Sequence, residues 1–385
     1  MKREDLHAEL PGRDTMREVI AINRPSFGKE EMEGVAKVVR SGIVTNKSGS
    51  GPFVTEFEAR FSRYVGAKYG VAVNSGTAAL HAALLALNIG HGDEVIVPSF
   101  SFVATAEAVA LTGARPVFID IDPRTYTLNP QYIDGIVTQK TKAIIAVHLF
   151  GLMANMADVN KAAKRLGLPV IEDAAQAHGA EFKGKKAGST GQMGCFSFYA
   201  SKNMTTGEGG MVTTSDPELV ASLKNIRNHG ETRPYFTTRL GHNYRMTELQ
   251  AAMGLAQLSK LPEFLKKRKR NAGFLSERLL TIEKLSLPYI PEGFTHGWNL
   301  YTARLRGFLP SRRNKIVEKL RKRSINVGTY YETPIHLNPF YRDATQSPLE
   351  ETEAACHQVF QLPIHPLVSE EDLRYIVKNV NEIIT

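Results

Sequence analysis

Short apolar segments alternate with helix-like segments from about Lys68 to Thr214. The apolar segments read "YGVAV", "EVIVP", "PVFIDI", "AIIAV" and "PVIED". Each is apolar throughout rather than at every second position, as expected of strands that are covered on both faces. Repeated strand–helix–strand order predicts an α/β fold with a largely parallel sheet and helices on both sides. "GCFSFYA" and "GGMVTT" are expected to add later strands to the same sheet.

The pattern changes after Thr214. Asp216 and Pro217 predict the start of a helix, and a long helical run follows from Thr247, with an interruption expected at Pro262. From about Leu285 strand-like and helix-like segments are mixed, which indicates a smaller C-terminal α/β domain. We therefore predict three parts, which are an N-terminal extension (1–21), a large domain (22–262) and a small domain (263–385).

Composition narrows the class of protein. No apolar run reaches the roughly 18 residues of a membrane span, so we expect no membrane partner. The start of the chain is charged and lacks the apolar core of a signal peptide, and only two cysteines are present, so a reducing cytoplasm is the expected location.

The chain has 48 basic and 39 acidic residues, a net charge of +9. The densest basic run, "KKRKR" at 266–270, lies in a helical pattern and is typical of a solvated helix face. Nucleic-acid binding through this run is a weak alternative, because no zinc-ligand spacing or RNA-binding aromatic motif accompanies it. We expect no nucleic-acid partner and no metal.

Ligands of open parallel sheets bind at the carboxyl ends of the strands. After "YGVAV", Gly76 permits close backbone approach and Thr77 begins a helix whose free N–H groups favour a phosphate. Taken on their own, these residues are better explained by an ordinary capped glycine turn. The spacing of a dinucleotide fingerprint or of a P-loop is absent.

Two further strand ends carry chemistry. Asp173 ends a buried strand, where a carboxylate needs a partner such as a cationic heterocycle, a helix cap or a salt bridge, and Gln176 follows three residues later. Lys202 follows the strand that holds Ser197. A desolvated lysine can form a Schiff base with a carbonyl, whereas a lone lysine more often extends to the solvent.

Together these three strand ends supply the groups that pyridoxal 5′-phosphate (PLP) needs. Its phosphate needs N–H donors and hydroxyls, its ring nitrogen needs a carboxylate to stay protonated, and its aldehyde needs an amine. The combination favours PLP although no single residue does.

The motifs resemble those of a known family. "NSGTAAL", "PSFSFVATAEAV", "LGHNYRMTELQAAMG" and the block from Val170 to Val212 are similar to the DegT/DnrJ/EryC1/StrS aminotransferases, and the resemblance extends over roughly 22–384. It implies PLP fold type I, like aspartate aminotransferase, with a mostly parallel seven-stranded sheet flanked by helices and a smaller C-terminal α/β domain.

The resemblance also implies residue roles. Lys202 would hold the cofactor and carry protons, Asp173 would bind the pyridine nitrogen and Gln176 the 3-hydroxyl oxygen. The phosphate would contact Gly76, Thr77 and Ser197, the ring would stack on Phe102, and Asn243 would reach the phosphate of a neighbouring subunit in a homodimer with shared active sites. His148 and His336 are expected at the substrate end, with core or surface positions equally open, and His178 occupies a motif position without an assigned role.

The family's sugar 3-dehydratases have histidine where this chain has Lys202, so the resemblance favours transamination. It implies transfer of an amino group from an amino acid, with L-glutamate expected, to a nucleotide-linked keto sugar. A keto-cyclitol substrate, aromatic ring formation and a non-catalytic regulatory protein on the same fold are the alternatives.

Overall fold

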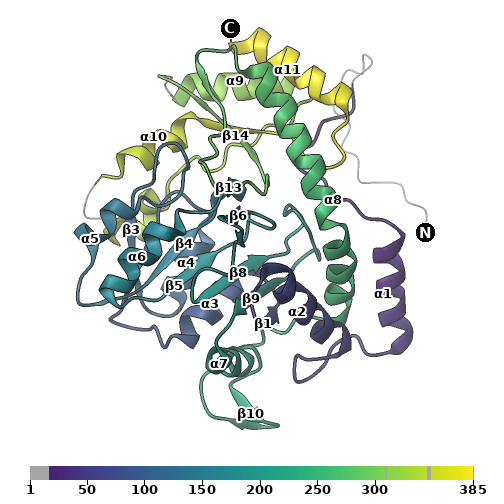
Figure 1. The fold of residues 1–385 in the computed structure, drawn as a ribbon, viewed down its shortest axis with the longest axis vertical. Helices are drawn as coiled ribbons and strands as arrows, with labels where there is room; N and C mark the ends of the chain where they lie inside the picture. The colour runs from purple at the N-terminus through teal and green to yellow at the C-terminus, as the bar shows by residue number, and fades with distance from the viewer. Residues whose placement is uncertain (1–16, 308–309, 345–347, 385) are drawn as a thin grey trace.

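The computed structural model describes residues 17–307, 310–344 and 348–384, so most of the predicted N-terminal extension lies outside the described residues. Its centre is a seven-stranded sheet in the order β1-β9-β8-β5-β4-β2-β3 (Figure 1). Only β9 runs against the other six strands. The strands are β1 (Tyr69–Val73), β2 (Glu94–Pro98), β3 (Arg115–Ile119), β4 (Thr141–Val147), β5 (Val170–Asp173), β8 (Met193–Ser197) and β9 (Gly210–Thr214).

Helices cover both faces of this sheet, as the uniformly apolar strands predict. One face packs against α3 (Gly76–Ala86), α4 (Ala104–Leu111) and α7 (Pro217–Arg227). The other packs against α2 (Pro52–Val65), α5 (Ile133–Ile136), α6 (Met156–Leu166) and the first part of α8 (Glu248–Leu279). Helix α1 (Lys29–Ser41) lies along α8 (Figure 1). The α/β fold predicted from the sequence, with its mostly parallel seven-stranded sheet, is confirmed.

The C-terminal part has a core of its own. A small antiparallel sheet of β12 (Leu285–Ser286), β14 (Tyr301–Leu305) and β15 (Val359–Leu362) packs with the second half of α8 and with α9 (Pro310–Lys322) and α11 (Glu370–Ile384). Helix α10 (Glu350–Gln358) precedes β15. The remaining short elements are η1 (Pro130–Tyr132), η2 (Leu149–Gly151), β6 (Glu181–Phe182), β7 (Lys185–Lys186), β10 (Glu231–Arg233), β11 (Phe236–Thr237), β13 (Phe294–Thr295), η3 (Ile335–Leu337) and η4 (Pro339–Ala344).

Helix α8 corrects one prediction. It continues through Pro262, where the sequence predicts an interruption, so the predicted domain boundary falls inside a continuous helix. Proline removes one N–H and crowds the preceding turn. Here Leu261 and Phe264 are buried on either side of the exposed Pro262, and their packing holds the helix together.

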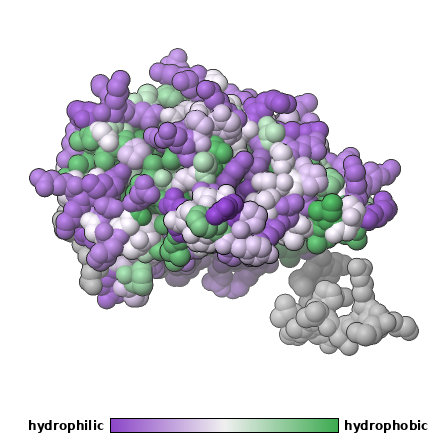
Figure 2. Space-filling model, turned by 90° about the horizontal axis from the view of Figure 1, so that it is seen from below, coloured by the Kyte–Doolittle hydropathy of each residue, from purple (hydrophilic) through white to green (hydrophobic). Residues whose placement is uncertain are grey.

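Two further observations bear on the predicted class. Across the described residues, no helix is long and apolar enough to span a bilayer. Cys195 and Cys356 are both buried and free. Figure 2 shows the lower face of the molecule, on which hydrophilic side chains prevail and hydrophobic patches are separate.

Candidate active site

The carboxyl ends of β1, β5 and β8 open onto one cavity of about 670 Å³. Seven of the predicted cofactor residues line it, and they come from four short stretches of the chain: Gly76, Thr77, Phe102, Asp173, Gln176, Ser197 and Lys202. The convergence follows from the topology, because β1, β5 and β8 run in the same direction and end at the same edge of the sheet.

The first turn of α3 forms an anion cradle. Ser75 caps the helix by accepting a hydrogen bond from the Ala78 N–H at 3.0 Å. The N–H groups of Gly76 and Thr77 belong to the first turn and have no partner within the helix. A Cβ atom at Gly76 would lie 2.7 Å from the Cβ of Ser197, so only glycine lets the Ser197 hydroxyl approach this turn. The cradle therefore combines helix N–H groups with a hydroxyl, which suits a phosphate.

Asp173 is buried, but its carboxyl group accepts only two hydrogen bonds from the described residues. Its Oδ2 accepts a hydrogen bond from the Thr105 hydroxyl at 2.8 Å, and its Oδ1 accepts one from the Ala175 N–H at 3.2 Å. Burial raises the pKa of this carboxyl, and these two bonds and the charge of Lys202 only partly offset that effect. A carboxylate in this state gains stability from a cationic ligand in the cavity.

Lys202 supplies the amine. Its side chain is half-buried, and burial lowers its pKa to about 8, although the nearby Asp173 charge acts in the opposite direction. A substantial fraction of the amine is therefore neutral near physiological pH. Such an amine can attack a carbonyl and can accept and return a proton.

Gln176 has a fixed orientation. Its Oε1 accepts the Phe150 N–H at 2.9 Å, so its amide nitrogen points the other way and donates to the Tyr331 hydroxyl at 3.0 Å. One N–H of Gln176 remains for a ligand. Phe102 forms the adjacent wall; the residue is 55% exposed, and its ring centroid lies 6.1 Å from that of Tyr331.

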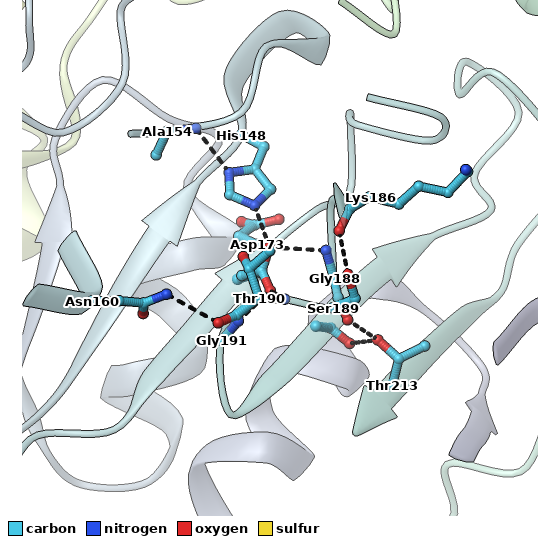
Figure 3. Close-up of polar contacts among 12 residues, drawn as sticks. His148, Ala154, Asn160, Asp173, Lys186, Gly188, Ser189, Thr190, Gly191 and Thr213 are labelled. Atoms are coloured by element: carbon cyan, nitrogen blue, oxygen red, sulfur yellow. Dashed lines mark hydrogen bonds and ion pairs between the residues drawn. The ribbon is translucent and has the colours of Figure 1, made fainter. Parts of the chain in front are cut away.

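His148 lies outside the cavity. It is fully buried, and its Nε2 donates to Glu172 at 2.8 Å. Its Nδ1 accepts the Ala154 N–H at 3.1 Å (Figure 3). Because an N–H can only donate, Nδ1 acts as the acceptor from Ala154. Both ring nitrogens are occupied, so the structure gives His148 no free atom for a substrate.

The other predicted polar residues also lie away from the lining. His178 is buried beside three aromatic rings, and burial followed by the charge of Lys202 lowers its pKa to about 3. The ring of His336 contacts Ser99 at 2.7 Å and Glu353 at 3.3 Å. Asn243 is exposed, and its backbone oxygen accepts the Asn74 amide at 3.2 Å. None of the three lines the cavity.

The cavity also has residues that the sequence did not single out. They come from the N-terminal segment, the α4 entry, the loop after Lys202 and the C-terminal part: Ile22, Asn23, Ser101, Thr105, Glu208, Asn299, Leu300, Tyr330 and Tyr331. Thr105 could have been found, because it is a hydroxyl at the start of a helix that follows a strand. The contact between Tyr331 and Gln176 spans 155 residues and carries no local signal.

Comparison with known proteins identifies the family. The model of the "DegT/DnrJ/EryC1/StrS aminotransferase family" matches residues 25–381. The chain belongs to this family. This is a family of PLP-dependent aminotransferases, EC 2.6.1, which confirms the resemblance noted in the sequence.

Individual relatives are similar over nearly the whole chain. GDP-perosamine synthase of Caulobacter vibrioides is 39% identical over 368 residues, 95% of this chain and 98% of that one. A UDP-N-acetyl-3-dehydro-alpha-D-glucosamine 3-aminotransferase of Acidithiobacillus ferrooxidans is 41% identical over 350 residues, 90% and 92% of the two chains. The PLP form of a putative sugar aminotransferase from Streptococcus pneumoniae superposes with a TM-score of 0.89 at 27% identity, covering 95% of this chain and 100% of that one.

The residues of this chain fit the family's cofactor. The anion cradle, which requires glycine at position 76, suits a phosphate. The buried Asp173 carboxyl group, with its raised pKa, suits a protonated ring nitrogen. The amine of Lys202, with its pKa lowered to about 8, suits an aldehyde. All three face the same cavity.

Proposed function

We propose that this protein binds PLP and moves an amino group from an amino acid, with L-glutamate as the expected donor, to a nucleotide-linked keto sugar. The observation that carries the proposal is the convergence of the α3 cradle, Asp173 and Lys202 on one cavity. Bound PLP supplies an aldehyde that condenses with amines and a protonated ring that withdraws electrons.

The chain's own residues would perform four tasks. Gly76, Thr77 and Ser197 would hold the phosphate through N–H groups and a hydroxyl. Asp173, oriented by Thr105, would hold the proton on the ring nitrogen. The Nζ of Lys202 would first attach the cofactor and, once displaced by the donor amine, would accept a proton from the donor's α-carbon and return it.

Two neighbouring side chains would orient the ring. The free N–H of Gln176 would donate to the ring oxygen, since Phe150 and Tyr331 fix the amide's direction. Phe102 would cover one face of the ring, because its aromatic side chain stands exposed in the cavity wall.

The acceptor class rests on the relatives. One is a GDP-perosamine synthase and another is an aminotransferase of a UDP-linked 3-dehydro sugar. They share a nucleotide-linked sugar and differ in the nucleotide. The net charge of +9 is consistent with an anionic substrate of this kind.

We also propose a homodimer in which Asn243 contributes to the site of the second copy. Asn243 is exposed, and the β10–β11 hairpin nearby exposes Tyr235 and Phe236. Mixing a Lys202→Ala chain with an Asn243→Ala chain tests this. If the sites are shared, each mixed dimer has one site with both residues intact, and activity returns in the mixture.

The experiment that tests the function has two stages. Purified protein is loaded with PLP, reduced with borohydride and digested, and mass spectrometry locates the modified peptide. Turnover is then measured with ¹⁵N-glutamate and a panel of GDP-linked and UDP-linked keto sugars beside keto-cyclitols. We expect the label on Lys202 and ¹⁵N in an amino sugar. A label on another lysine, or transfer to a cyclitol alone, would contradict the proposal.

A further inference from the structure

One member of the basic run at 266–270 is not solvated. Lys266, Lys269 and Arg270 are exposed, whereas Arg268 is only 2% exposed. The prediction of a solvated face is therefore wrong for this residue. Its position on α8 turns it toward the protein interior, where it contacts Trp298 and Asn299, just before β14.

The guanidinium of Arg268 has no carboxylate partner in residues 17–307, 310–344 and 348–384. Its Nη1 donates to the carbonyl oxygens of Trp298 and Asn299, both at 3.2 Å, and its Nη2 donates to Oδ1 of Asn23 at 2.9 Å. Its Nε has no partner within those residues. Burial lowers the pKa of Arg268 to about 9. A buried charge without a counterion is costly, so an anion close by would stabilise it.

Two of these partners form part of the cavity wall. Asn23 and Asn299 line the same cavity as Asp173 and Lys202. A guanidinium can only donate, so Oδ1 of Asn23 faces Arg268 and its NH₂ group is left for another acceptor. Arg268 also fixes the backbone of Asn299.

The cavity otherwise has little positive charge. Among the described residues that line it, Lys202 alone carries a cationic side chain, and that amine is committed to the cofactor. The phosphate already has a cradle at the start of α3. An amino-acid donor brings a carboxylate on the same carbon as its amine, so this group must lie within the cavity when the amine reaches the cofactor.

We propose that Asn23 and the Arg268 charge behind it, next to Asn299 in the cavity wall, form the subsite for the donor's carboxylate, an inference that rests on the proposed function. The Asn23 amide donates to the carboxylate, and Arg268 orients that amide and supplies the compensating charge. Arg268 is a positioning residue here, since it does not line the cavity.

Asn23→Asp tests this without creating a void. The aspartate keeps the bond to Arg268 but neutralises its charge and removes the NH₂ donor. Lys269→Gln is the matched control, because it removes a positive charge from the exposed neighbour on the same helix. Arg268→Gln is a second variant, although loss of a buried arginine endangers folding.

The measurements use PLP-loaded protein. Absorbance of the bound cofactor follows its single-turnover reaction with L-glutamate and, separately, with hydroxylamine, an amine nucleophile without a carboxylate. Calorimetry follows binding of maleate, a dicarboxylate without an amine. For Asn23→Asp we expect the half-saturating glutamate concentration and the maleate Kd to rise about 10-fold to 100-fold, with the hydroxylamine rate within about twofold and a higher Tm.

Lys269→Gln is expected to match the wild type in all four measurements. Unchanged glutamate and maleate binding in Asn23→Asp, or an equal loss with hydroxylamine, would overturn the subsite. If wild-type protein carries PLP on Lys202 but binds neither glutamate nor maleate, the subsite is overturned and the cofactor assignment stands. A protein that holds no PLP would instead refute the proposed function.

Discussion

Two neighbouring acids at the end of β5 face opposite sides of the sheet and have opposite surroundings. Glu172 accepts four hydrogen bonds, from His148 Nε2 and from the N–H groups of Gly188, Thr190 and Gly191, at 2.6–2.9 Å. Asp173 accepts two and faces the cavity. Both are buried, and neither has a lysine or arginine within ion-pair distance among the described residues.

The pKa values separate the two carboxyl groups. Burial would raise the pKa of Glu172, but the bond from His148 and those from the loop N–H groups outweigh it, and the net shift is downward. For Asp173 burial prevails and the pKa is raised. A carboxylate whose oxygens accept many hydrogen bonds from the protein stabilises the fold. A carboxylate that accepts few and lies beside a cavity is available for a ligand.

The sign of each shift fixes its effect on stability. The lowered pKa of Glu172 means that its contribution is present above the unfolded value of 4.5 and is lost as pH falls through the folded value. The raised pKa of Asp173 means that the ionised form opposes folding of the cofactor-free protein above 3.8. Bound cofactor would reverse that second effect.

The largest effect is expected for Lys202, which lines the cavity. Lys202→Ala removes the amine that would attach the cofactor and move the proton, so turnover should fall at least about 1,000-fold. The Tm of the cofactor-free protein should not fall, because a desolvated amine is removed. Turnover assays and thermal unfolding measure the two. A variant that keeps wild-type turnover would refute the role of Lys202.

The next largest effect is expected around Glu172, on the side of the sheet opposite the cavity. His148→Leu removes a donor to Glu172 and leaves the Ala154 N–H unpaired, so the free energy of unfolding should fall by about 3 kcal/mol. PLP affinity of the folded protein should stay within a few-fold. Denaturant unfolding and cofactor titration distinguish the outcomes. Unchanged stability with lost cofactor binding would place His148 in the site instead.

A smaller effect concerns pH. Because the pKa of Lys202 is lowered to about 8, the neutral amine is the minor form below that value. The rate at which cofactor-free protein takes up PLP should rise about tenfold per unit of pH below 8 and level off above it. Stopped-flow absorbance measures the rate. A rate that still climbs up to pH 10 would indicate an ordinary exposed lysine.

Much of the cavity side could be predicted from sequence. Gly76, Asp173 and Lys202 each lie at, or within five residues of, the end of an apolar strand. Parallel strands place their ends along one edge of the sheet. Topology therefore converts a local pattern into a site. The family motifs added Phe102, Gln176 and Ser197, which the structure also places in the lining.

Contacts between distant segments could not be predicted in this way. His148 is a strand-end polar residue like Asp173, and only the loop at 188–191 shows that it supports Glu172. Arg268 has the same sequence surroundings as its solvated neighbours, and its burial depends on Asn23 and Trp298. Proline inside a helix predicts an interruption, but tertiary packing keeps α8 continuous through Pro262.

The most direct test of the account exchanges each acid for its amide and measures both cofactor affinity and stability. Asp173→Asn should weaken PLP binding and lower turnover at least about 100-fold, while the cofactor-free protein keeps or gains Tm. Glu172→Gln should cost about 3 kcal/mol or more of unfolding free energy, because an NH₂ group then faces N–H donors. The reverse assignment, with Asp173→Asn unstable and Glu172→Gln defective only in cofactor binding, would contradict it.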